Sequence, residues 1–260
     1  VGSEMCIRDS GLVFTIENTR DIIDVDSEAH MKFKSFKEML LSNVKSHANN
    51  VALAYDEDGE IKSLTYAELY REISARREQI ARLDANCVGI LQAPSKKWII
   101  DMFACVLARK QTVLLDPMSE PTVIQAQTLA TDVETLLTDE LTSRHASLLK
   151  TAPVGTVAPS KDEGDILFFT SGTTNSSKAV VLTSSSLCAS AWNGQAKCPC
   201  NETDNLLCML PLTHVFGFVC AMLWPMSQGA KISITRGMRY IAQDCKYFKP
   251  TIISVVPVSY

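Results

Sequence analysis

The sequence of 260 residues lacks an apolar run long enough to cross a lipid bilayer, and it has no excess of basic residues. Its longest apolar stretch, 215–226, is well short of the about 20 residues that a membrane-spanning helix needs. The formal net charge of −4 gives no reason to expect nucleic acid as a partner. With 46% hydrophobic residues the chain has ample material for a core. We therefore expect a globular protein without a transmembrane span.

A disulfide framework is not indicated either. The nine cysteines are odd in number and several lie inside apolar runs, which is typical of reduced, buried thiols in the cytoplasm. Cys198 and Cys200 form the only close pair, and their spacing is shorter than that of most zinc sites. A metal site there is one interpretation, but without a nearby histidine a plain loop is favoured. We expect a cytoplasmic protein.

Residues 1–10 match nothing that follows and contain no apolar core that would make them a signal peptide. We interpret them as an artefact of sequence assembly and assign the fold to residues 11–260. Residues 151–165 are rich in proline, glycine and charge, so they are a candidate subdomain boundary.

Short apolar segments alternate with amphipathic ones along most of the chain. This alternation predicts an α/β fold with parallel-sheet layers and helices on both faces. Thr65 and Glu68 have the spacing of a capping box, which predicts a helix that begins directly after Thr65. The other predicted helices are 31–47, 95–110, 119 onward, 140–150, 184 onward, 215–226 and 238–248. The predicted strands are 51–55, 61–66, 87–91, 112–116, 134–138, 166–169, 180–182, 206–210, 230–234 and 251–257.

The stretch from residue 166 to 183, ILFFTSGTTNSSKAVVLT, places a hydroxyl-rich loop between two apolar flanks. The flanks are predicted to be buried strands that hold the loop rigidly. Gly172 lets a phosphate come close to main-chain N–H groups, and Lys178 adds a positive charge. The loop is predicted to bind a polyphosphate; the alternative is a solvated hairpin loop with an incidental lysine. The predicted phosphate-binding residues are Thr170, Ser171, Gly172, Thr173, Thr174, Asn175, Ser176, Ser177 and Lys178.

This loop is not a Walker-type P-loop. That motif has glycine directly before its lysine and serine or threonine directly after it. Here Ser177 precedes Lys178 and Ala179 follows it. A Walker-type NTPase is therefore not predicted.

A second candidate site follows the strand predicted at 206–210. His214 lies in the sequence PLTHVFG, at the carboxyl end of that strand, where α/β proteins bind ligands. The alternative is a structural histidine whose ring is hydrogen-bonded to backbone in a turn.

Both stretches resemble motifs of the adenylate-forming superfamily, which contains acyl-CoA synthetases, luciferases and the adenylation domains of peptide synthetases. TSGTTNSSKA is similar to the family pattern T-S-G-[ST]-T-G-x-P-K-G, and PLTHVFG is similar to P-x-x-H-x-x-G. LLDP at 114–117 is similar to a turn of the same family. Asn175 and Ala179 stand where the family has glycine, and Ser177 where it has proline. Asparagine tolerates a left-handed backbone, so Asn175 is expected to keep the turn, whereas loss of the proline should loosen the loop.

The resemblance implies that a carboxylic acid reacts with ATP to give an acyl-adenylate, and that the thiol of coenzyme A then takes up the acyl group. It implies Lys178 and His214 as catalytic residues, with His214, Phe216 and Gly217 binding the acid. ATP, Mg²⁺ with Thr174 as a ligand, and coenzyme A are the expected cofactors. Residues 213–219 contain no acid to pair with an α-amine, so a fatty or other apolar acid is favoured over an amino acid.

The resemblance begins near residue 33 and covers only the front part of the family's N-terminal domain. The adenine- and magnesium-binding segment, the ribose-binding aspartate, the hinge and the late catalytic lysine of the family have no match in the sequence. We therefore expect a truncated enzyme that is inactive by itself. The alternatives are an amino-acid adenylation domain of a peptide synthetase and a non-catalytic nucleotide-binding remnant.

Overall fold

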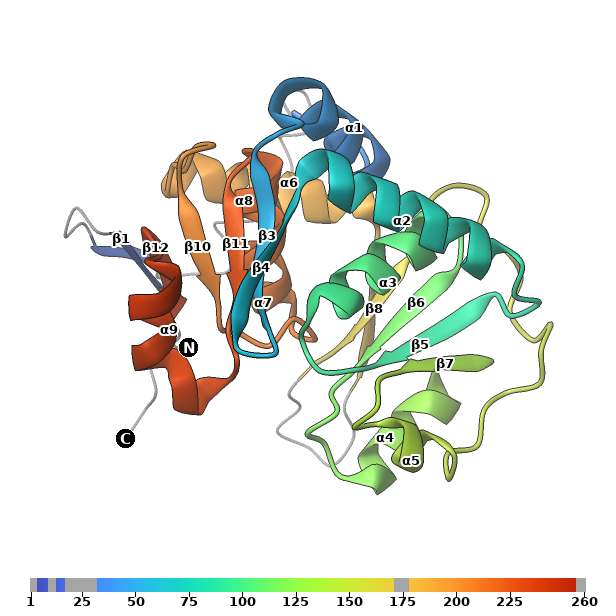
Figure 1. Cartoon of the computed structure of the whole chain (residues 1–260). Coiled ribbons are helices and arrows are strands. Elements are labelled where there is room, and N and C mark those ends of the chain that lie inside the picture. Colours follow the sequence, from blue (N-terminus) through green and yellow to red (C-terminus); the bar gives the residue numbers. More distant parts are fainter. Residues whose placement is uncertain (1–3, 9–12, 17–31, 171–177, 256–260) are drawn as a thin grey trace. The chain divides into compact units, whose positions relative to one another are not determined.

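The computed structural model of the chain describes residues 4–8, 13–16, 32–170 and 178–255, and it divides into two compact units (Figure 1). The first unit comprises Val1–Tyr70 and Ser185–Tyr260, and the second comprises Arg71–Ser184. The candidate boundary at 151–165 lies within the second unit. None of the described helices combines the length and the apolar character that a membrane span requires.

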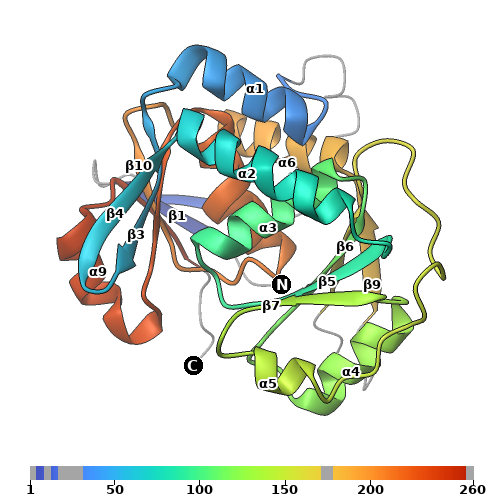
Figure 2. The same ribbon diagram turned by 45° about the vertical axis from the view of Figure 1, so that its right-hand side comes forward.

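The second unit contains a sheet with the strand order β7-β5-β6-β8-β9. Its first four strands are parallel, and β9 is antiparallel to β8. Helix α3 covers one face of the sheet, whereas α4 and α5 cover the other (Figures 1 and 2). The elements are α2 Tyr66–Ala81, which begins in the first unit, β5 Cys87–Leu91, α3 Lys96–Leu107, β6 Gln111–Leu115, α4 Pro121–Ala130, β7 Thr135–Thr138, α5 Ser143–Ala146, β8 Ile166–Phe169 and β9 Ala179–Leu182.

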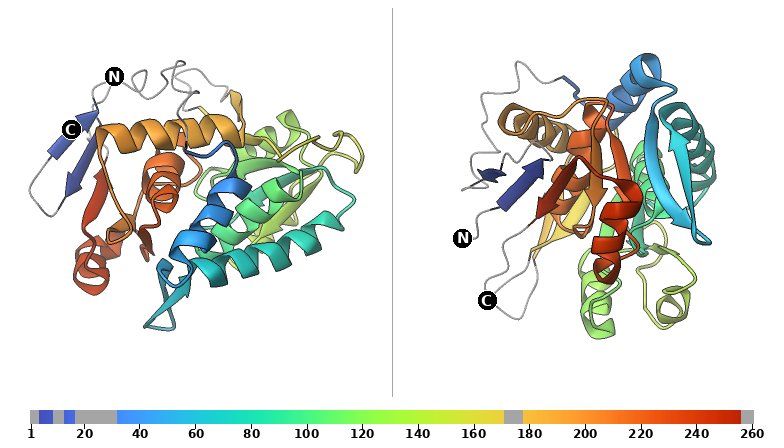
Figure 3. Two further views of the ribbon diagram at one scale, coloured as in Figure 1. Left: turned by 90° about the horizontal axis from the view of Figure 1, so that it is seen from above. Right: turned by 60° about the vertical axis from the view of Figure 1, so that its left-hand side comes forward.

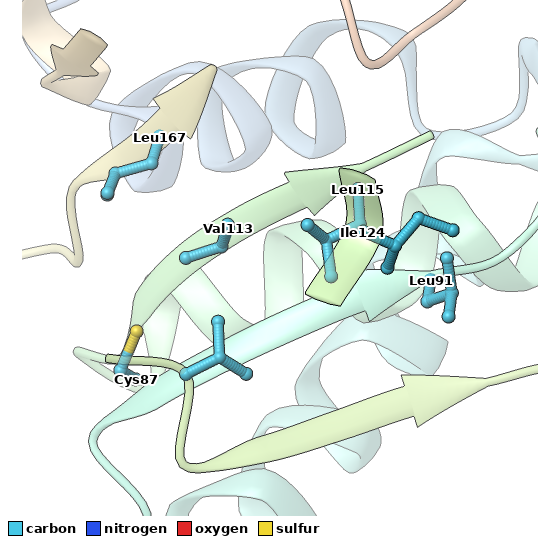
Figure 4. Close-up of a cluster of buried hydrophobic side chains, with 7 residues drawn as sticks. Cys87, Leu91, Val113, Leu115, Ile124 and Leu167 are labelled. Atoms are coloured by element: carbon cyan, nitrogen blue, oxygen red, sulfur yellow. The ribbon is translucent and has the colours of Figure 1, made fainter. Parts of the chain in front are cut away.

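The apolar side chains of these parallel strands form a buried cluster (Figure 4). Leu91 of β5, Leu115 of β6 and Leu167 of β8 pack with Ile124 of α4. Burial of such side chains is the main stabilising contribution to a domain of this size. The cluster consists of Cys87, Leu91, Val113, Leu115, Ile124, Val133 and Leu167.

A buried carboxylate lies within the mostly apolar helix α3, which Ser95 caps by accepting a hydrogen bond from the N–H of Trp98. Asp101 is almost fully buried, yet its two oxygens lie 2.6 Å from Arg76 Nε and 2.6 Å from Lys97 Nζ. A buried charge is tolerated only when it is paired in this way.

Glu134 fastens the connector 151–165 to the sheet of the second unit. Its carboxylate accepts hydrogen bonds from the backbone N–H groups of Asn86, Cys87 at 3.1 Å and Val157 at 2.9 Å. Burial by itself raises the pKa of the Glu134 carboxyl, but the N–H donors of Val157, Asn86, Cys87 and Gly155 outweigh it. The pKa therefore lies below its ordinary value of 4.5.

Replacing Glu134 with glutamine is expected to lower the free energy of unfolding by about 1–3 kcal/mol, because charge-assisted hydrogen bonds are lost and an amide N–H₂ meets N–H donors. A carboxyl whose pKa is depressed in the folded state contributes stability at neutral pH and loses it as the pH falls through the folded pKa. Denaturant unfolding at decreasing pH should therefore show a steeper loss of stability in the wild type than in Glu134→Gln. The exposed Glu140→Gln is the control. Identical pH profiles of wild type and Glu134→Gln would contradict this account.

The first unit contains a sheet with the strand order β2-β1-β12-β10-β11-β3-β4. The strands β12, β10, β11 and β3 are parallel, and β1, β2 and β4 run antiparallel to their neighbours. The elements are β1 Glu4–Arg8, β2 Val13–Ile16, α1 Phe36–His47, β3 Val51–Glu57, β4 Glu60–Thr65, α6 Ser184–Lys197, β10 Asn205–Cys208, α7 Val215–Phe218, η3 Val219–Leu223, α8 Trp224–Ser227, β11 Lys231–Ile234, η4 Met238–Tyr240, α9 Ile241–Phe248 and β12 Ile252–Val255.

Strand β1 comes from the segment interpreted above as an assembly artefact. It pairs antiparallel with β12, beside which it lies in the right-hand view of Figure 3. The edge of β12 is therefore occupied in the structure. The origin of residues 1–10 stays a prediction.

The parallel strands of the first unit carry helices on both faces, as the alternation in the sequence predicts. Leu207 of β10 and Ala54 of β3 pack with Phe248 of α9, and Ile253 of β12 packs against the same cluster. Successive residues of a strand point to opposite faces. The side chains that flank Ile253 therefore face the other side of the sheet.

Of two predictions of local structure, one is confirmed and the other is wrong in its length. The capping box is confirmed, because the N–H of Thr65 donates to Glu68 Oε2 at 2.8 Å and the N–H of Glu68 donates to Thr65 Oγ1 at 3.2 Å. The helix predicted at 140–150 is wrong in length, because only Ser143–Ala146 is helical. Leu141 and Leu148 are 80% and 79% exposed, so they find no apolar surface that would stabilise a longer helix.

Candidate functional site

The hydroxyl-rich loop closes a hairpin between β8 and β9. The two strands are paired antiparallel, with Phe169 opposite Ala179. The N–H of Thr170 donates to the carbonyl oxygen of Lys178 at 3.0 Å, which extends the ladder by one residue. The strand–loop–lysine–strand order read from the sequence is therefore confirmed.

The two arms of this hairpin differ in burial. Ile166 and Leu167 of β8 are 0% and 3% exposed, as predicted. The prediction of a buried second strand is wrong, because Val180 and Val181 of β9 are 38% and 55% exposed. The reason is topological: β9 is the outermost strand of its sheet in the described part of the chain.

Lys178 and Thr170 lie at the base of the loop, and both are exposed. The ammonium group of Lys178 has no hydrogen-bond acceptor or carboxylate partner among the residues that the structure describes. An uncompensated charge at the end of a hairpin fits the polyphosphate of ATP. The predicted phosphate-binding residues Ser171, Gly172, Thr173, Thr174, Asn175, Ser176 and Ser177, and with them the predicted magnesium ligand Thr174, lie outside the described residues.

His214 lies in a turn that follows β10 in the first unit. Its N–H donates to the carbonyl of Pro211 at 3.2 Å, and its own carbonyl accepts a hydrogen bond from Phe218 at 2.8 Å. His214 is thereby the N-cap of α7, but its side chain caps nothing and is exposed. Within the described ranges the imidazole has no hydrogen-bond partner, so the backbone-bonded structural histidine is not what the structure shows.

Gly217 is required where the turn meets the helix. A Cβ atom on this residue would lie 2.2 Å from the carbonyl oxygen of Pro211 and 3.1 Å from Cβ of Leu210. The neighbouring Phe218 is fully buried, and its ring stacks on Phe36 at a centroid distance of 6.3 Å. Phe216 is half-buried. The turn therefore presents His214 and Phe216 while Gly217 and Phe218 hold it to the core.

The apolar helix predicted at 215–226 is confirmed as a continuous helical stretch, but its pitch changes along its length. It consists of α7, a π-helical segment η3 and α8, and the N–H of Trp224 donates to the carbonyl of Val219, five residues earlier. Pro225 lacks an N–H and cannot continue a regular ladder, which accounts for the change of pitch. A proline inside a helical pattern is a recognised signal of irregular helix geometry, and here the helix continues past Pro225 to Ser227.

No other strong nucleophile or metal site accompanies these residues in the described part of the chain. Burial raises the pKa of the Cys208 thiol, at the end of β10, to about 12, so it is not a thiolate at neutral pH. No three side chains of His, Cys, Asp or Glu are grouped as metal ligands within the described ranges. Gln195 accepts from the N–H of Cys200 at 3.0 Å and donates to its carbonyl at 2.8 Å, as expected of a structural loop.

The structure brings Thr170 together with Lys178 in the second unit, and His214 together with Phe216 and Gly217 in the first. Chemically, the first group offers an exposed cation to an anionic ligand. The second group offers an exposed imidazole two residues before the half-buried Phe216.

Comparison with known proteins gives concordant findings. A family model described as AMP-binding enzyme matches residues 40–260. Oxalate–CoA ligase of Arabidopsis thaliana is 33% identical over 100 residues, which cover 37% of this chain and 20% of that protein. Long-chain-fatty-acid–CoA ligase 2 of Schizosaccharomyces pombe is 27% identical over 225 residues, which cover 83% of this chain and 30% of that protein.

A solved structure of o-succinylbenzoate coenzyme A synthetase from Bacillus subtilis, in complex with ATP and a magnesium ion, aligns with a TM-score of 0.69. The sequence identity is 20%, and the alignment covers 83% of this chain and 62% of that one. At this identity the likeness shows the fold: two mostly parallel sheets flanked by helices, as predicted. The chain spans less than two thirds of the length of each of these proteins.

Proposed function

The chain belongs to the AMP-binding enzyme family, and on that premise we propose that the whole protein activates an apolar carboxylic acid with ATP and joins it to coenzyme A. The observation that carries this proposal is the presence of the exposed Lys178 at the base of the β8–β9 hairpin and the exposed His214 after β10, in the order of the family's motifs. Several relatives are named CoA ligases, which supports coenzyme A as the acyl acceptor.

In the first half-reaction a carboxylate oxygen attacks the α-phosphorus of ATP, and the bond to pyrophosphate breaks. Negative charge accumulates on the leaving pyrophosphate, where the ammonium of Lys178 and the loop hydroxyl groups stabilise it. Mg²⁺, when bound, would supply further positive charge to the phosphates, and Thr174 is the residue that would hold it. His214 donates a hydrogen bond beside the reacting carboxylate and so orients it.

In the second half-reaction the sulfur of coenzyme A attacks the acyl carbonyl carbon, AMP leaves, and the thiol proton passes to solvent. The proposed acid is apolar because the accessible residues after His214 are Val215 and Phe216, and 213–219 contains no carboxylate for an α-amine. The relatives' named acids are diverse, from oxalate and sulfoacetate to long-chain fatty acids. The second candidate is amino-acid adenylation, and the third is a non-catalytic nucleotide-binding remnant.

The test is ATP–pyrophosphate exchange by the whole protein with a panel of fatty, aryl, dicarboxylic and α-amino acids. We expect exchange with apolar acids and formation of the corresponding acyl-CoA. Preference for an α-amino acid over every apolar acid would favour the peptide-synthetase function. Absence of exchange with any acid would favour the remnant.

The same assay run on residues 1–260 alone is expected to give no AMP release with a fatty acid and coenzyme A. By the family resemblance, the groups that hold the adenine, the ribose and the metal have no match in this stretch. Loss of one preorganised transition-state donor commonly costs about 100-fold in rate, and here several are missing together. Turnover by the 260 residues at the rate of the whole protein would contradict this part of the proposal. We propose a cytoplasmic location, because Cys87, Cys105 and Cys208 are buried cysteines outside any disulfide, which is typical of a reducing compartment.

A further inference from the structure

The turns that follow β10 and β11 leave the sheet of the first unit side by side. The two strands are parallel, and Cys208 at the end of β10 lies opposite Ile234 at the end of β11. The N–H of Thr235 donates to the carbonyl oxygen of Cys208 at 3.3 Å. We call residues 209–214, which include His214, the β10 turn, and residues 235–240 the β11 turn.

After these two neighbouring strands the chain moves in opposite directions along the sheet. From β10 it continues to β11 on one side, and from β11 it passes back across β10 to β12 on the other. Connections between parallel strands are almost always right-handed, so the helices after β10 and the helix α9 after β11 cover opposite faces. The carboxyl ends of two strands whose connections diverge in this way are where α/β proteins bind ligands.

A buried carboxylate fixes the β11 turn. Asp244 of α9 is 0% exposed. Its Oδ2 accepts hydrogen bonds from Thr235 Oγ1 at 2.7 Å and from the N–H of Arg236 at 2.9 Å. Its Oδ1 lies 2.7 Å from both Nε and Nη2 of Arg236. The carboxylate therefore holds the start of the turn and compensates the charge of Arg236.

The rest of the β11 turn is ordered around a glycine. Gly237 has a φ of +123°, which residues with a Cβ atom rarely adopt. Its N–H donates to Thr235 Oγ1 at 3.2 Å, and its carbonyl accepts from the N–H of Tyr240 at 2.9 Å. The Tyr240 ring centre lies 5.0 Å from the guanidinium carbon of Arg236. Met238 is therefore carried on a backbone that is held on both sides.

Exposed apolar side chains gather at the two turns. Val215, directly after His214, is 44% exposed, and Met238 and Tyr240 on the β11 turn are 70% and 44% exposed. A group of exposed apolar side chains is typical of a surface that binds an apolar ligand. Methionine suits such a surface, because its unbranched side chain adapts to ligands of different shape.

We propose that the β11 turn contacts the apolar part of the acid, with Met238 as a specificity-determining residue and Asp244 as the positioning residue that holds the turn. The inference rests on the proposed function for the identity of the ligand. It goes beyond that function by naming the residue that distinguishes long acids from short ones.

The first experiment measures ATP–pyrophosphate exchange by the whole protein with straight-chain carboxylic acids of increasing length. We expect Met238→Ala to lower kcat/KM for the longer acids by about tenfold, because an apolar contact is lost. The values for the shortest acids, and KM for ATP, should not change. Met238→Leu keeps the apolar volume and should stay near the wild type. Leu41→Ala is the control, since Leu41 is 43% exposed on α1 of the same unit.

Asp244→Asn tests the positioning role in the same assay. The neutral amide no longer compensates Arg236 and matches fewer of the donors, so the turn loosens and the loss should again grow with chain length. The double variant should lose little more than Met238→Ala, because both changes act through one contact. A merely structural aspartate would lower stability without any dependence on chain length. Thr235→Val, which removes a single hydroxyl donor, replaces Asp244→Asn if that variant does not fold.

The second experiment measures binding without turnover. Dilute hydrogen peroxide oxidises exposed methionines to the sulfoxide, and mass spectrometry of peptides gives the rate at each residue. We expect decanoate to slow oxidation of Met238 several-fold in the whole protein. The reference in the same sample is Met118 of the second unit, which is 89% exposed.

An equal loss of kcat/KM at every chain length in Met238→Ala, or no loss at any, would overturn the inference. Unchanged oxidation of Met238 in the presence of decanoate would overturn it as well. If the wild type exchanges pyrophosphate with no acid, the proposed function fails. The protection of Met238 by decanoate then decides by itself whether the β11 turn binds an apolar ligand.

Discussion

Replacing Lys178 with alanine is expected to slow acyl-adenylate formation by the whole protein by about 100- to 1,000-fold, the usual cost of one lost transition-state donor. The reason is that Lys178 is the exposed cation at the base of the hydroxyl-rich hairpin, where it pairs with no carboxylate of the described residues. Charge on the leaving pyrophosphate grows as the bond to the α-phosphorus breaks. The ammonium therefore stabilises the transition state more than the bound ATP.

The measurement is ATP–pyrophosphate exchange at saturating acid, together with a thermal unfolding curve. Because the side chain is exposed and makes no described contact, the midpoint of unfolding should not change. Lys161→Ala is the matched control, since Lys161 is an exposed lysine of the same unit outside the hairpin. Pyrophosphate exchange by Lys178→Ala at the wild-type rate would show that the hairpin is not part of the active site.

Replacing Gly217 with alanine is expected to lower activity by about 100-fold or more, because displacements near 1 Å in a catalytic arrangement have effects of that size. The added Cβ would lie 2.2 Å from the carbonyl oxygen of Pro211. This atom belongs to the backbone, so no change of rotamer relieves the clash. The turn must open, and His214 moves with it. Overpacking of this kind also destabilises a fold by about 1–3 kcal/mol.

Gly194→Ala is the control for this change. Gly194 lies in α6 of the same unit, and a Cβ there would lie 3.7 Å from Cγ of Trp224, an ordinary contact. Alanine in a helix is favoured over glycine by up to about 1 kcal/mol, so this variant should be as stable as the wild type or more so. If Gly217→Ala unfolds and reacts as Gly194→Ala does, the close approach to Pro211 has no bearing on the site.

Sequence patterns that involve only neighbouring residues correctly predicted the elements whose structure depends on hydrogen bonds between those neighbours. The capping box of Thr65 and Glu68 forms because each residue satisfies a backbone N–H of the other. The strand β10 and the turn that carries His214 follow from an apolar run that ends at a proline. The resemblance to adenylate-forming enzymes was correct at the level of the family.

Other features depend on which strand or helix packs against a given element, and a single sequence does not show these packing partners. The residues Val180 and Val181 have the pattern of a buried strand, yet β9 is an edge strand and exposes them. The stretch 140–150 has apolar residues at helical spacing, but only one turn of it finds a partner. In contrast, the change of helix pitch before Pro225 has a signal in the sequence, because proline lacks the N–H that a regular helix uses.

The unequal arms of the hairpin have a mechanical consequence. The arm that ends at Thr170 is built into the core through Ile166 and Leu167, whereas the arm that begins at Lys178 is joined to its sheet on one side only. No strand of the described residues pairs with the outer side of β9, so this arm is the more compliant of the two. A lysine on a compliant support follows its anion over a short path. Under the proposed function, Lys178 stays with the pyrophosphate as it departs, and the buried strands of the sheet do not have to move.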